Sequence, residues 1–284
     1  MKFLGLLGER LGHSLSPEIH KSIFKNVNIE GAYELFEIPP NSLEDFTKAT
    51  KLLKVQGFNV TIPYKEKIMN YLDEISDEAK RIGAVNTVVL KENKLYGYNT
   101  DYFGIDAMLK NEGIRVNGKD IVILGTGGAC KAMLTYVLDN NSNNIYIVSR
   151  NPKIVDLDLT NNKVKVIDYE ELESIKGDII VNTTPVGMYP NVNKSPVGKE
   201  VVNNYNIVID LIYNPLETVF LKYGRECGKK TISGLYMLVG QAIKAEAIFN
   251  DIKINNRVMY NVYKELYRTF SLREDVKWIK RILP

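Results

Sequence analysis

Short apolar runs alternate with segments of helical periodicity along almost the whole chain. The runs predict strands at 2–7, 32–38, 57–62, 86–91, 120–124, 144–148, 163–167, 178–182, 207–212 and 230–232. Between them, segments such as 17–26 and 42–54 place apolar residues three and four positions apart, the spacing of an amphipathic helix. Such alternation is typical of parallel sheets flanked by helices, so we predict an α/β fold.

The pattern also indicates where the chain divides. Residues 93–100 have the pattern of the return arm of a hairpin, and a helix is expected to begin near Asp101 and to bridge two domains. The strand at 120–124 then starts a fresh βαβ unit. After Gly234 the pattern becomes fully helical, with helices predicted at 235–250, 256–270 and 274–283.

Composition narrows the possible functions. The chain has 284 residues, of which 45% are hydrophobic and 25% charged, as expected for a globular protein that buries a core. Its net charge of +3 is too small to favour nucleic acid or a membrane surface as the main partner. No apolar run approaches the roughly 20 residues that span a bilayer, and the N-terminus has the pattern of a first strand rather than of a secretion signal.

Cysteine and histidine content argues against metals and disulfides. Cys130 and Cys227 lie far apart in sequence, which gives neither a disulfide framework nor a zinc spacing. We interpret both as small core residues of a protein in the reducing cytoplasm, and we expect no metal dependence.

The segment from Gly57 to Met69 carries the strongest candidate for chemistry. Pro63 must end the apolar strand because proline cannot donate to a sheet ladder, and an amphipathic helix is predicted to start at Lys65. Lys65 is therefore expected at the tip of a strand, where it could carry a proton to or from a substrate oxygen. Taken alone, it could equally be a surface lysine at a helix start.

A glycine-rich turn follows the strand at 120–124. Gly125 permits a tight turn, and Gly127 allows backbone N–H groups to approach a pyrophosphate at the start of the next helix. Cys130 occupies the third small position of this GxGxxG pattern. The preceding strand and the following helix supply the context that the motif of a dinucleotide site requires, although a purely structural turn is the alternative.

The end of the strand at 144–148 indicates which dinucleotide binds. NAD-dependent proteins normally place an acidic residue there to accept from the ribose 2′-hydroxyl. This chain instead has Ser149 and Arg150, with Lys153 close behind. A guanidinium suits a 2′-phosphate, so the sequence favours NADP.

Seven polar motifs, taken in order, resemble the shikimate dehydrogenase family. The resemblance covers about residues 3–250, and the motifs are specific as a set: G-H-S-x-S-P from Gly12, N-V-T-I-P-x-K-E from Asn59, A-V-N-T from Ala84, N-T-D from Asn99, G-x-G-G-A from Gly125, N-T-T-P-x-G-M from Asn182 and G-x-x-M-L-x-x-Q-A from Gly234.

The resemblance implies a two-domain architecture and a small-molecule substrate. It implies a mixed-sheet substrate-binding and catalytic domain at 1–101, with the C-terminal helices 236–284 packing on it. A Rossmann-like NADP domain with a parallel sheet would occupy 102–235. The implied reaction is the reversible NADPH-dependent reduction of 3-dehydroshikimate to shikimate in a cytoplasmic enzyme of aromatic amino-acid biosynthesis. The sequence leaves a monomer and a homodimer both open.

The same resemblance assigns roles to individual residues. Lys65 and Asp101 would form the catalytic pair. The substrate would be held by Ser14, Ser16, Thr61, Asn86, Asp101, Tyr213 and Gln241. The cofactor would be bound by Gly125, Gly127, Gly128, Ala129, Ser149, Arg150, Lys153, Gly234 and Met237.

The chain departs from the family pattern at a few positions. Tyr64 stands where histidine is common, Lys21 where asparagine is often found, and Asn250 near the usual place of a tryptophan. The closing segment 268–284 extends past the usual end. Three alternatives stay open: a quinate/shikimate dehydrogenase using NAD, a non-catalytic NADP-binding regulator, and a nucleic-acid binder acting through the basic tail.

Overall fold

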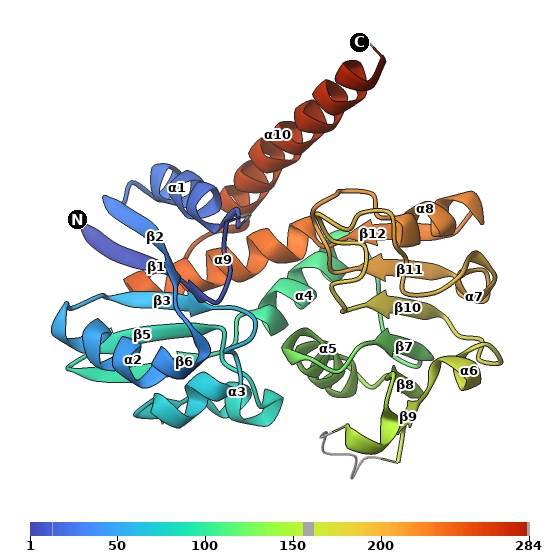
Figure 1. The fold of residues 1–284 in the computed structure, drawn as a ribbon, viewed down its shortest axis with the longest axis horizontal. Coiled ribbons are helices and arrows are strands. Elements are labelled where there is room, and N and C mark those ends of the chain that lie inside the picture. Colours follow the sequence, from blue (N-terminus) through green and yellow to red (C-terminus); the bar gives the residue numbers. More distant parts are fainter. Residues whose placement is uncertain (13, 156–161, 283–284) are drawn as a thin grey trace. The chain divides into compact units, whose positions relative to one another are not determined.

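The computed structural model describes residues 1–12, 14–155 and 162–282, with side chains for all of these except residue 154 and residues 272–282. The chain divides into two compact units, each with its own six-stranded sheet (Figure 1). The first unit comprises Met1–Thr100 and Val239–Pro284, and the second comprises Asp101–Leu238.

The first unit has a mixed sheet with strand order β2-β1-β3-β5-β6-β4. Strand β1 runs parallel to β2 and β3, whereas β5 runs antiparallel to β3 and β6. Its elements are β1 (Lys2–Gly8), α1 (Ser16–Val27), β2 (Gly31–Glu37), α2 (Leu43–Leu52), β3 (Gly57–Val60), β4 (Glu74–Ile75), α3 (Asp77–Ile82), β5 (Thr87–Lys91), β6 (Lys94–Tyr98), α9 (Leu235–Asn250) and α10 (Asn256–Ile282), with short 3₁₀ turns at Pro40–Ser42 and Lys67–Tyr71.

Two apolar clusters hold this sheet. On one side Leu7, Phe58 and Val88 pack with Leu43 of α2 and with Tyr64. The other cluster joins Leu4, Leu6 and Val89 to Phe24 of α1 and to Ala245 and Phe249 of α9. Helix α9 is apolar around most of its circumference, which is typical of a buried helix, and from Val239 onward it belongs to the first unit.

Two expectations for this unit are wrong in detail. No α-helix begins at Lys65: after Val60 the chain makes turns and then the 3₁₀ helix Lys67–Tyr71, because Tyr64 is buried and its hydroxyl donates to the Ile38 carbonyl oxygen at 2.6 Å. The C-terminal pattern predicted two helices, but α10 continues without a break from Asn256 to Ile282. The side chains of the basic tail lie outside the described residues.

The second unit has an all-parallel sheet with strand order β12-β11-β10-β7-β8-β9 (Figure 1). Read along the chain this is the doubly wound order, in which the direction of strand addition reverses between β7 and β10. Its elements are α4 (Asp101–Asn111), β7 (Ile121–Leu124), α5 (Gly128–Asp139), β8 (Ile145–Val148), β9 (Val164–Ile167), α6 (Tyr169–Leu172), β10 (Ile179–Asn182), α7 (Lys199–Val202), β11 (Ile207–Asp210), α8 (Val219–Glu226) and β12 (Lys230–Ser233), with a 3₁₀ turn at Pro152–Ile154.

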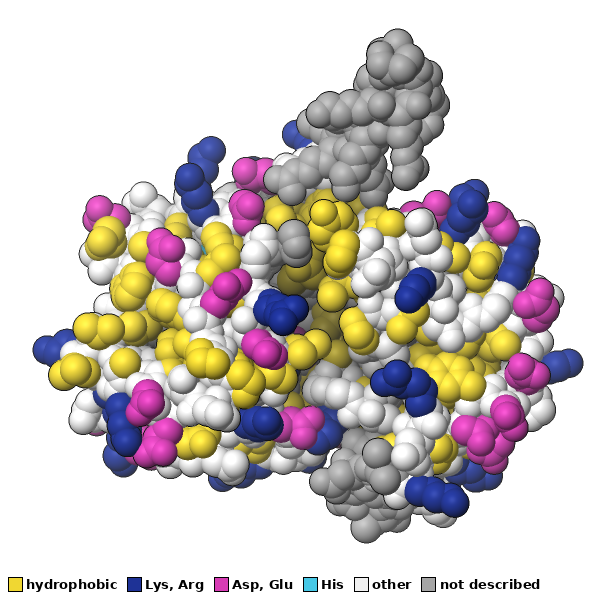
Figure 2. Space-filling view, in the orientation of Figure 1, with side chains coloured by type: hydrophobic (Ala, Val, Ile, Leu, Met, Phe, Trp, Pro, Cys, Tyr) yellow, Lys and Arg dark blue, Asp and Glu magenta, His cyan; other side chains and the backbone are white. Residues whose placement is uncertain are grey.

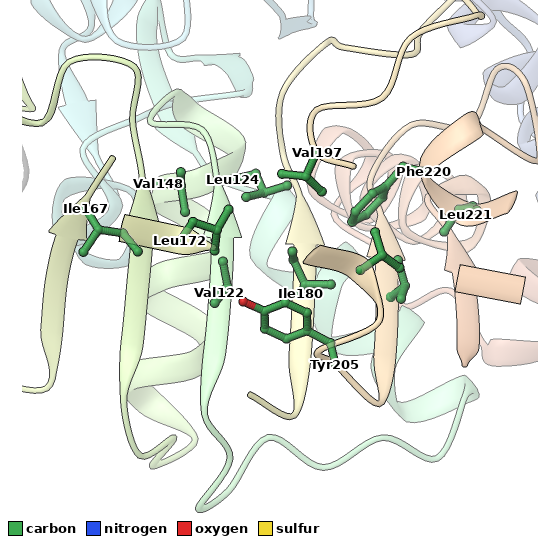
Figure 3. Packing of buried hydrophobic residues seen from close by; sticks show 12 residues of the cluster. Val122, Leu124, Val148, Ile167, Leu172, Ile180, Val197, Tyr205, Phe220 and Leu221 are labelled. Atoms are coloured by element: carbon green, nitrogen blue, oxygen red, sulfur yellow. The ribbon is translucent and has the colours of Figure 1, made fainter. Parts of the chain in front are cut away.

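The central strands of this sheet are buried along their whole length. Strand β7 is a continuous apolar run, and so is β10 up to its last residue, Asn182, as expected where helices cover both faces of a parallel sheet. Figure 3 shows Tyr205 packed beside Val122 and Ile180, Phe220 beside Val197, and Leu172 of α6 beside Val148. The predicted fold class, α/β with one mixed and one Rossmann-like parallel sheet, is confirmed.

The surface mixes charges of both signs. On the face that Figure 2 shows, lysine and arginine side chains are interspersed with aspartate and glutamate over the described residues. Among the described helices, none combines the length and the apolar composition needed to cross a membrane.

Candidate active site

Three short segments of the first unit bring most of the predicted substrate-binding side chains to the ends of its strands. The first follows β1. Ser14 lies just before α1, and its hydroxyl donates to the Ser16 hydroxyl at 3.1 Å and accepts from the Ser16 backbone N–H at 3.2 Å. Ser16 is the first residue of α1 but does not cap it, because Leu15 holds the N-cap position without a side-chain hydrogen bond. His13, also part of this motif, lies outside the described residues.

The second segment carries Thr61 and Lys65. The backbone N–H of Thr61 donates to Leu7 at 2.9 Å, and the Lys65 carbonyl oxygen accepts from Val85 at 2.8 Å. Tyr64, the departure from the family pattern, is fully buried between them and anchored on Ile38. The backbone that presents Lys65 is therefore held from both sides, and its side chain is half-buried.

The third segment surrounds Asn86 at the start of β5. The Asn86 side-chain oxygen accepts from the Thr100 N–H at 2.7 Å and from the Thr87 hydroxyl at 3.0 Å. Gln241 of α9 joins the group, since its side-chain oxygen accepts from the Thr100 hydroxyl at 3.5 Å. These contacts orient the Asn86 amide with its oxygen toward the backbone.

Asp101 and Tyr213 belong to the second unit. Asp101 is buried at the first residue of α4, and Tyr213 is half-buried after β11. Because Lys65 and Asp101 lie in different units, their pairing stays a prediction.

The glycine turn after β7 has the geometry of a phosphate cradle. Gly125 adopts φ of 108°, which favours glycine, and a Cβ there would approach Thr184 Cγ2 to 2.8 Å. Gly127 is the N-cap of α5, and no atom lies within 4 Å of where its Cβ would be. The first N–H groups of a helix, here those of Gly128 and Ala129, lack intrahelical acceptors and suit an anion. This turn fits a dinucleotide pyrophosphate.

The end of β8 fits a 2′-phosphate. Ser149 is buried and its hydroxyl accepts from the Asn151 N–H at 3.1 Å, whereas Arg150 and Lys153 are exposed. Burial raises the pKa of Tyr169, and Arg150 opposes this shift, which places its positive charge near the start of α6. Two basic side chains and no carboxylate at residues 149–153 match the sequence-based preference for NADP.

Cys130 is buried at the start of α5. Burial raises the pKa of Cys130 to about 12, so its thiol stays protonated and packs at the start of α5. Both cysteines are free thiols. Among the residues that the structure describes, His, Cys, Asp and Glu form no group of three or more that could hold a metal.

Comparisons with known proteins agree with this geometry. Residues 6–88 match the shikimate dehydrogenase substrate binding domain, and residues 120–214 match the family described as NADP oxidoreductase coenzyme F420-dependent. The chain is 52% identical to "Shikimate dehydrogenase (NADP(+))" of Clostridium beijerinckii, over 95% of this chain and all of that protein. The chain belongs to the shikimate dehydrogenase family.

Solved structures of the family are closely similar. Shikimate dehydrogenase 1 from Peptoclostridium difficile shares 58% identity and a TM-score of 0.91, over 95% of this chain and 99% of that one. The shikimate 5-dehydrogenase of Thermus thermophilus, solved in complex with NADP(H) and shikimate, shares 31% identity and a TM-score of 0.83, over 93% of this chain and 99% of that one.

A buried carboxylate in the shikimate dehydrogenase fold was given no role by sequence reasoning. Asp210 ends β11 and accepts hydrogen bonds from Asn182 and the Ile212 N–H, both at 3.0 Å, and from the Thr218 hydroxyl at 2.6 Å. Asn182 in turn accepts from Thr184 at 2.7 Å. Asp210 thereby ties together the loops that follow β10 and β11, next to the glycine turn. The available signal was a polar residue at the end of each of two apolar strands.

Two more of the predicted cofactor-binding residues, Gly234 and Met237, follow β12. A Cβ at Gly234 would lie 2.0 Å from the Leu211 carbonyl oxygen, so only glycine lets the chain pass this close to the loop after β11. Met237, three residues later on α9, is buried.

The pKa of Asp210 predicts an unusual dependence of stability on pH. Burial raises this pKa to about 7, against the hydrogen bonds from Thr218, Ile212 and Asn182, which lower it. In the unfolded chain the pKa of an aspartate is about 3.9. Between pH 4 and 7 the folded state therefore holds a proton on Asp210 that the unfolded state has lost. Asp210 therefore makes its full contribution to the free energy of unfolding below pH 4, and this contribution falls as the pH rises to 7.

We expect Asp210→Asn to remove this fall. The free energy of unfolding should be measured in urea at pH 5.0 and at pH 7.5. Between these two values the parent chain should lose on the order of 2 kcal/mol more than the variant does. Asp178→Asn is the matched control: Asp178 pairs with Lys119 and its pKa is lowered, so it stays ionised throughout. Equal pH slopes for the parent chain and Asp210→Asn would contradict the raised pKa.

Proposed function

We propose that this chain is an NADP-dependent shikimate dehydrogenase, which reversibly reduces 3-dehydroshikimate to shikimate in the pathway to chorismate and the aromatic amino acids. One observation carries the proposal: the 52% identity, over 95% of the chain, to a protein named shikimate dehydrogenase (NADP(+)). The motifs that hold Lys65, Asn86 and Gly127 all fall within this match.

Lys65 is proposed to move the proton. When bound, NADPH supplies the hydride to the ring carbonyl carbon. The Lys65 ammonium donates to the carbonyl oxygen, stabilises the negative charge that develops there and delivers a proton to it. In the reverse direction a neutral Lys65 accepts that proton. The Asp101 carboxylate is proposed to pair with Lys65 and to orient it.

The remaining polar side chains are proposed to hold the substrate. Hydroxyls of Ser14, Ser16 and Thr61 suit its carboxylate. The amides of Asn86 and Gln241 suit its ring hydroxyls, and Tyr213 completes the site. For Asn86 this is supported by the orientation of the amide, whose oxygen already accepts from Thr100.

The cofactor is proposed to lie along the carboxyl edge of the parallel sheet. Gly125, Gly127, Gly128 and Ala129 would receive the pyrophosphate at the start of α5, and Ser149, Arg150 and Lys153 the 2′-phosphate. Gly234 and Met237 would border the nicotinamide. Ligands of doubly wound sheets bind where the strand order reverses, which here is between β7 and β10.

We further propose a cytoplasmic enzyme, monomeric or homodimeric. Two free cysteines support a reducing compartment.

The direct test follows the absorbance of reduced nicotinamide with shikimate and each oxidised cofactor. We expect turnover with NADP⁺ to exceed turnover with NAD⁺. A preference for NAD⁺ together with turnover of quinate would favour the quinate/shikimate alternative, and cofactor binding without any turnover would favour the regulator.

Replacing Lys65 by alanine tests the proton transfer. We expect Lys65→Ala to lower kcat by about 10²- to 10⁴-fold, with a much smaller change in KM for shikimate, because its contact strengthens in the transition state. Lys67→Ala, an exposed lysine two residues away, is the matched control and should keep the parent kcat. An unchanged kcat in Lys65→Ala would remove Lys65 from the mechanism.

Replacing Arg150 tests the choice of cofactor. We expect Arg150→Ala to raise KM for NADP⁺ about tenfold, as for loss of one hydrogen bond to a charged group, while the weak activity with NAD⁺ stays the same. Arg225→Ala is the control, because Arg225 is an exposed arginine of the same unit that pairs with Glu217 at 2.6 Å. Equal losses with both cofactors would place Arg150 away from the 2′-phosphate.

A further inference from the structure

Asp210 lies where several loops of the second unit leave the sheet. It is 0% exposed at the end of β11, which lies between β10 and β12, and β10 in turn lies beside β7 (Figure 1). Because these four strands are parallel, the loops that follow them meet at one edge of the sheet. Two of these loops carry residues proposed for the cofactor site, Gly125 after β7 and Gly234 after β12.

One set of contacts joins Asp210 to the glycine turn. Its Oδ1 accepts from the Asn182 side-chain amide at 3.0 Å. The Asn182 side-chain oxygen accepts in turn from the N–H and the hydroxyl of Thr184, at 3.0 and 2.7 Å. Thr184 packs directly on the turn, since a Cβ at Gly125 would lie 2.8 Å from its Cγ2. Asp210 is thereby joined through two side chains to the turn that is proposed to receive the pyrophosphate.

A second set of contacts joins the same oxygen to Gly234. Asp210 Oδ1 also accepts from the Ile212 N–H at 3.0 Å. The Ile212 carbonyl oxygen accepts from the Gly234 N–H at 3.0 Å. A Cβ at Gly234 would overlap the Leu211 backbone, so the two segments are in direct contact. The glycine proposed to border the nicotinamide therefore has its place set by the loop that Asp210 holds.

The other carboxylate oxygen contacts a different part of the unit. Asp210 Oδ2 accepts from the Thr218 hydroxyl at 2.6 Å. Thr218 is the N-cap of α8, and its hydroxyl also accepts from the Leu221 N–H at 3.3 Å. Neither residue is among those proposed to bind the cofactor. The contacts of Oδ1 thus lead to two proposed cofactor-binding segments, whereas the contact of Oδ2 leads to α8.

We propose that Asp210 is a positioning residue for the cofactor site: its Oδ1 holds the glycine turn at Gly125 and the backbone at Gly234 in one fixed arrangement, so that both are in place when NADP binds. Groups that are already in place lower the cost of ordering on binding. Since Asp210 is 0% exposed, it acts through Asn182 and Ile212. This inference rests on the proposed function and concerns only its cofactor site.

Replacing Asp210 by leucine and by asparagine tests the link. Leucine is close in size and removes both acceptor oxygens, whereas asparagine keeps an oxygen that can accept from Asn182 and Ile212. Titration calorimetry of the free enzyme without shikimate measures binding and needs no turnover. We expect Asp210→Leu to raise Kd for NADP⁺ about three- to tenfold, the scale of one hydrogen bond, and Asp210→Asn to stay within about twofold of the parent chain.

A fragment of the cofactor shows whether the loss is local. Adenosine 2′-phosphate carries the group proposed for Arg150 but lacks the pyrophosphate and the nicotinamide. We expect Asp210→Leu to bind this fragment with the Kd of the parent chain. Equal losses of affinity for NADP⁺ and for the fragment would show a general loss of structure and overturn the inference. An unchanged Kd for NADP⁺ in Asp210→Leu would overturn it as well.

Two threonines give a milder, matched pair of variants, which keeps the inference testable if thermal unfolding shows that Asp210→Leu does not fold. Thr184→Val removes the hydroxyl that donates to Asn182, on the side of the glycine turn. Thr218→Val removes the hydroxyl on the side of α8. We expect Thr184→Val to raise Kd for NADP⁺ about two- to fivefold, and Thr218→Val to lower the melting temperature with Kd unchanged. Equal Kd values for the two variants would contradict the inference.

A double variant shows whether Thr184 and Asp210 act through the same link. In the Asp210→Leu background, adding Thr184→Val should raise Kd for NADP⁺ by less than about twofold, because both changes remove one connection. The full effect of Thr184→Val in both backgrounds would contradict the link from Asp210 to the glycine turn. Binding of NADP⁺ by the parent chain tests the proposed function by itself, so failure of that function and failure of this inference are distinguished.

Discussion

A buried polar side chain must find hydrogen-bond partners inside the protein, and much of this structure follows from that requirement. In the second unit the apolar strands β10 and β11 end in the buried Asn182 and Asp210, and in the first unit Asn59 and Thr87 are buried in β3 and β5. Each such residue is removed from water where the sheet meets its loops. The partners they find are one another and the backbone of the loops that follow, so the loops are held by the residues that the sheets bury.

The two units satisfy this requirement in different ways. In the second unit one carboxylate, Asp210, accepts hydrogen bonds from a neighbouring strand, from its own loop and from the threonine that caps α8. Ionisation of this one buried residue therefore carries a desolvation penalty. In the first unit neutral side chains are joined in series, from Tyr33 through Asn59 and Thr87 to Asn86, and none of these four is charged. The Asn86 amide, which is proposed to hold the substrate, is thus fixed by hydrogen bonds from Thr87 and Thr100. Preorganised polar groups of this kind contribute to binding and catalysis because little reorganisation remains when the ligand arrives.

Much of the fold could be predicted from the sequence. Strand and helix alternation, the glycine turn at Gly125 and the basic residues at the end of β8 are local patterns, each set by a few neighbouring residues. The order of the strands depends on contacts between distant segments, so local patterns did not predict it. The turn after Lys65 was predicted wrongly as an α-helix, because burial of Tyr64 outweighs helical periodicity. The single long helix α10 was also missed, since a weak pattern near residue 271 suggested a break that the backbone does not make.

Some features of the candidate site follow from local sequence patterns, and others do not. The motifs around Lys65, Asn86 and Arg150 can be read directly because each carries its chemistry within a few residues. The contacts of Tyr33 with Asn59, and of His20 with Glu246, join positions 26 and 226 residues apart, and no local pattern marks them. The sequence by itself therefore determined the class of fold and the family, and it supplied the candidate residues for the chemistry. Only the tertiary structure decided which buried side chains meet, because that depends on how the sheet and α9 bring distant segments together.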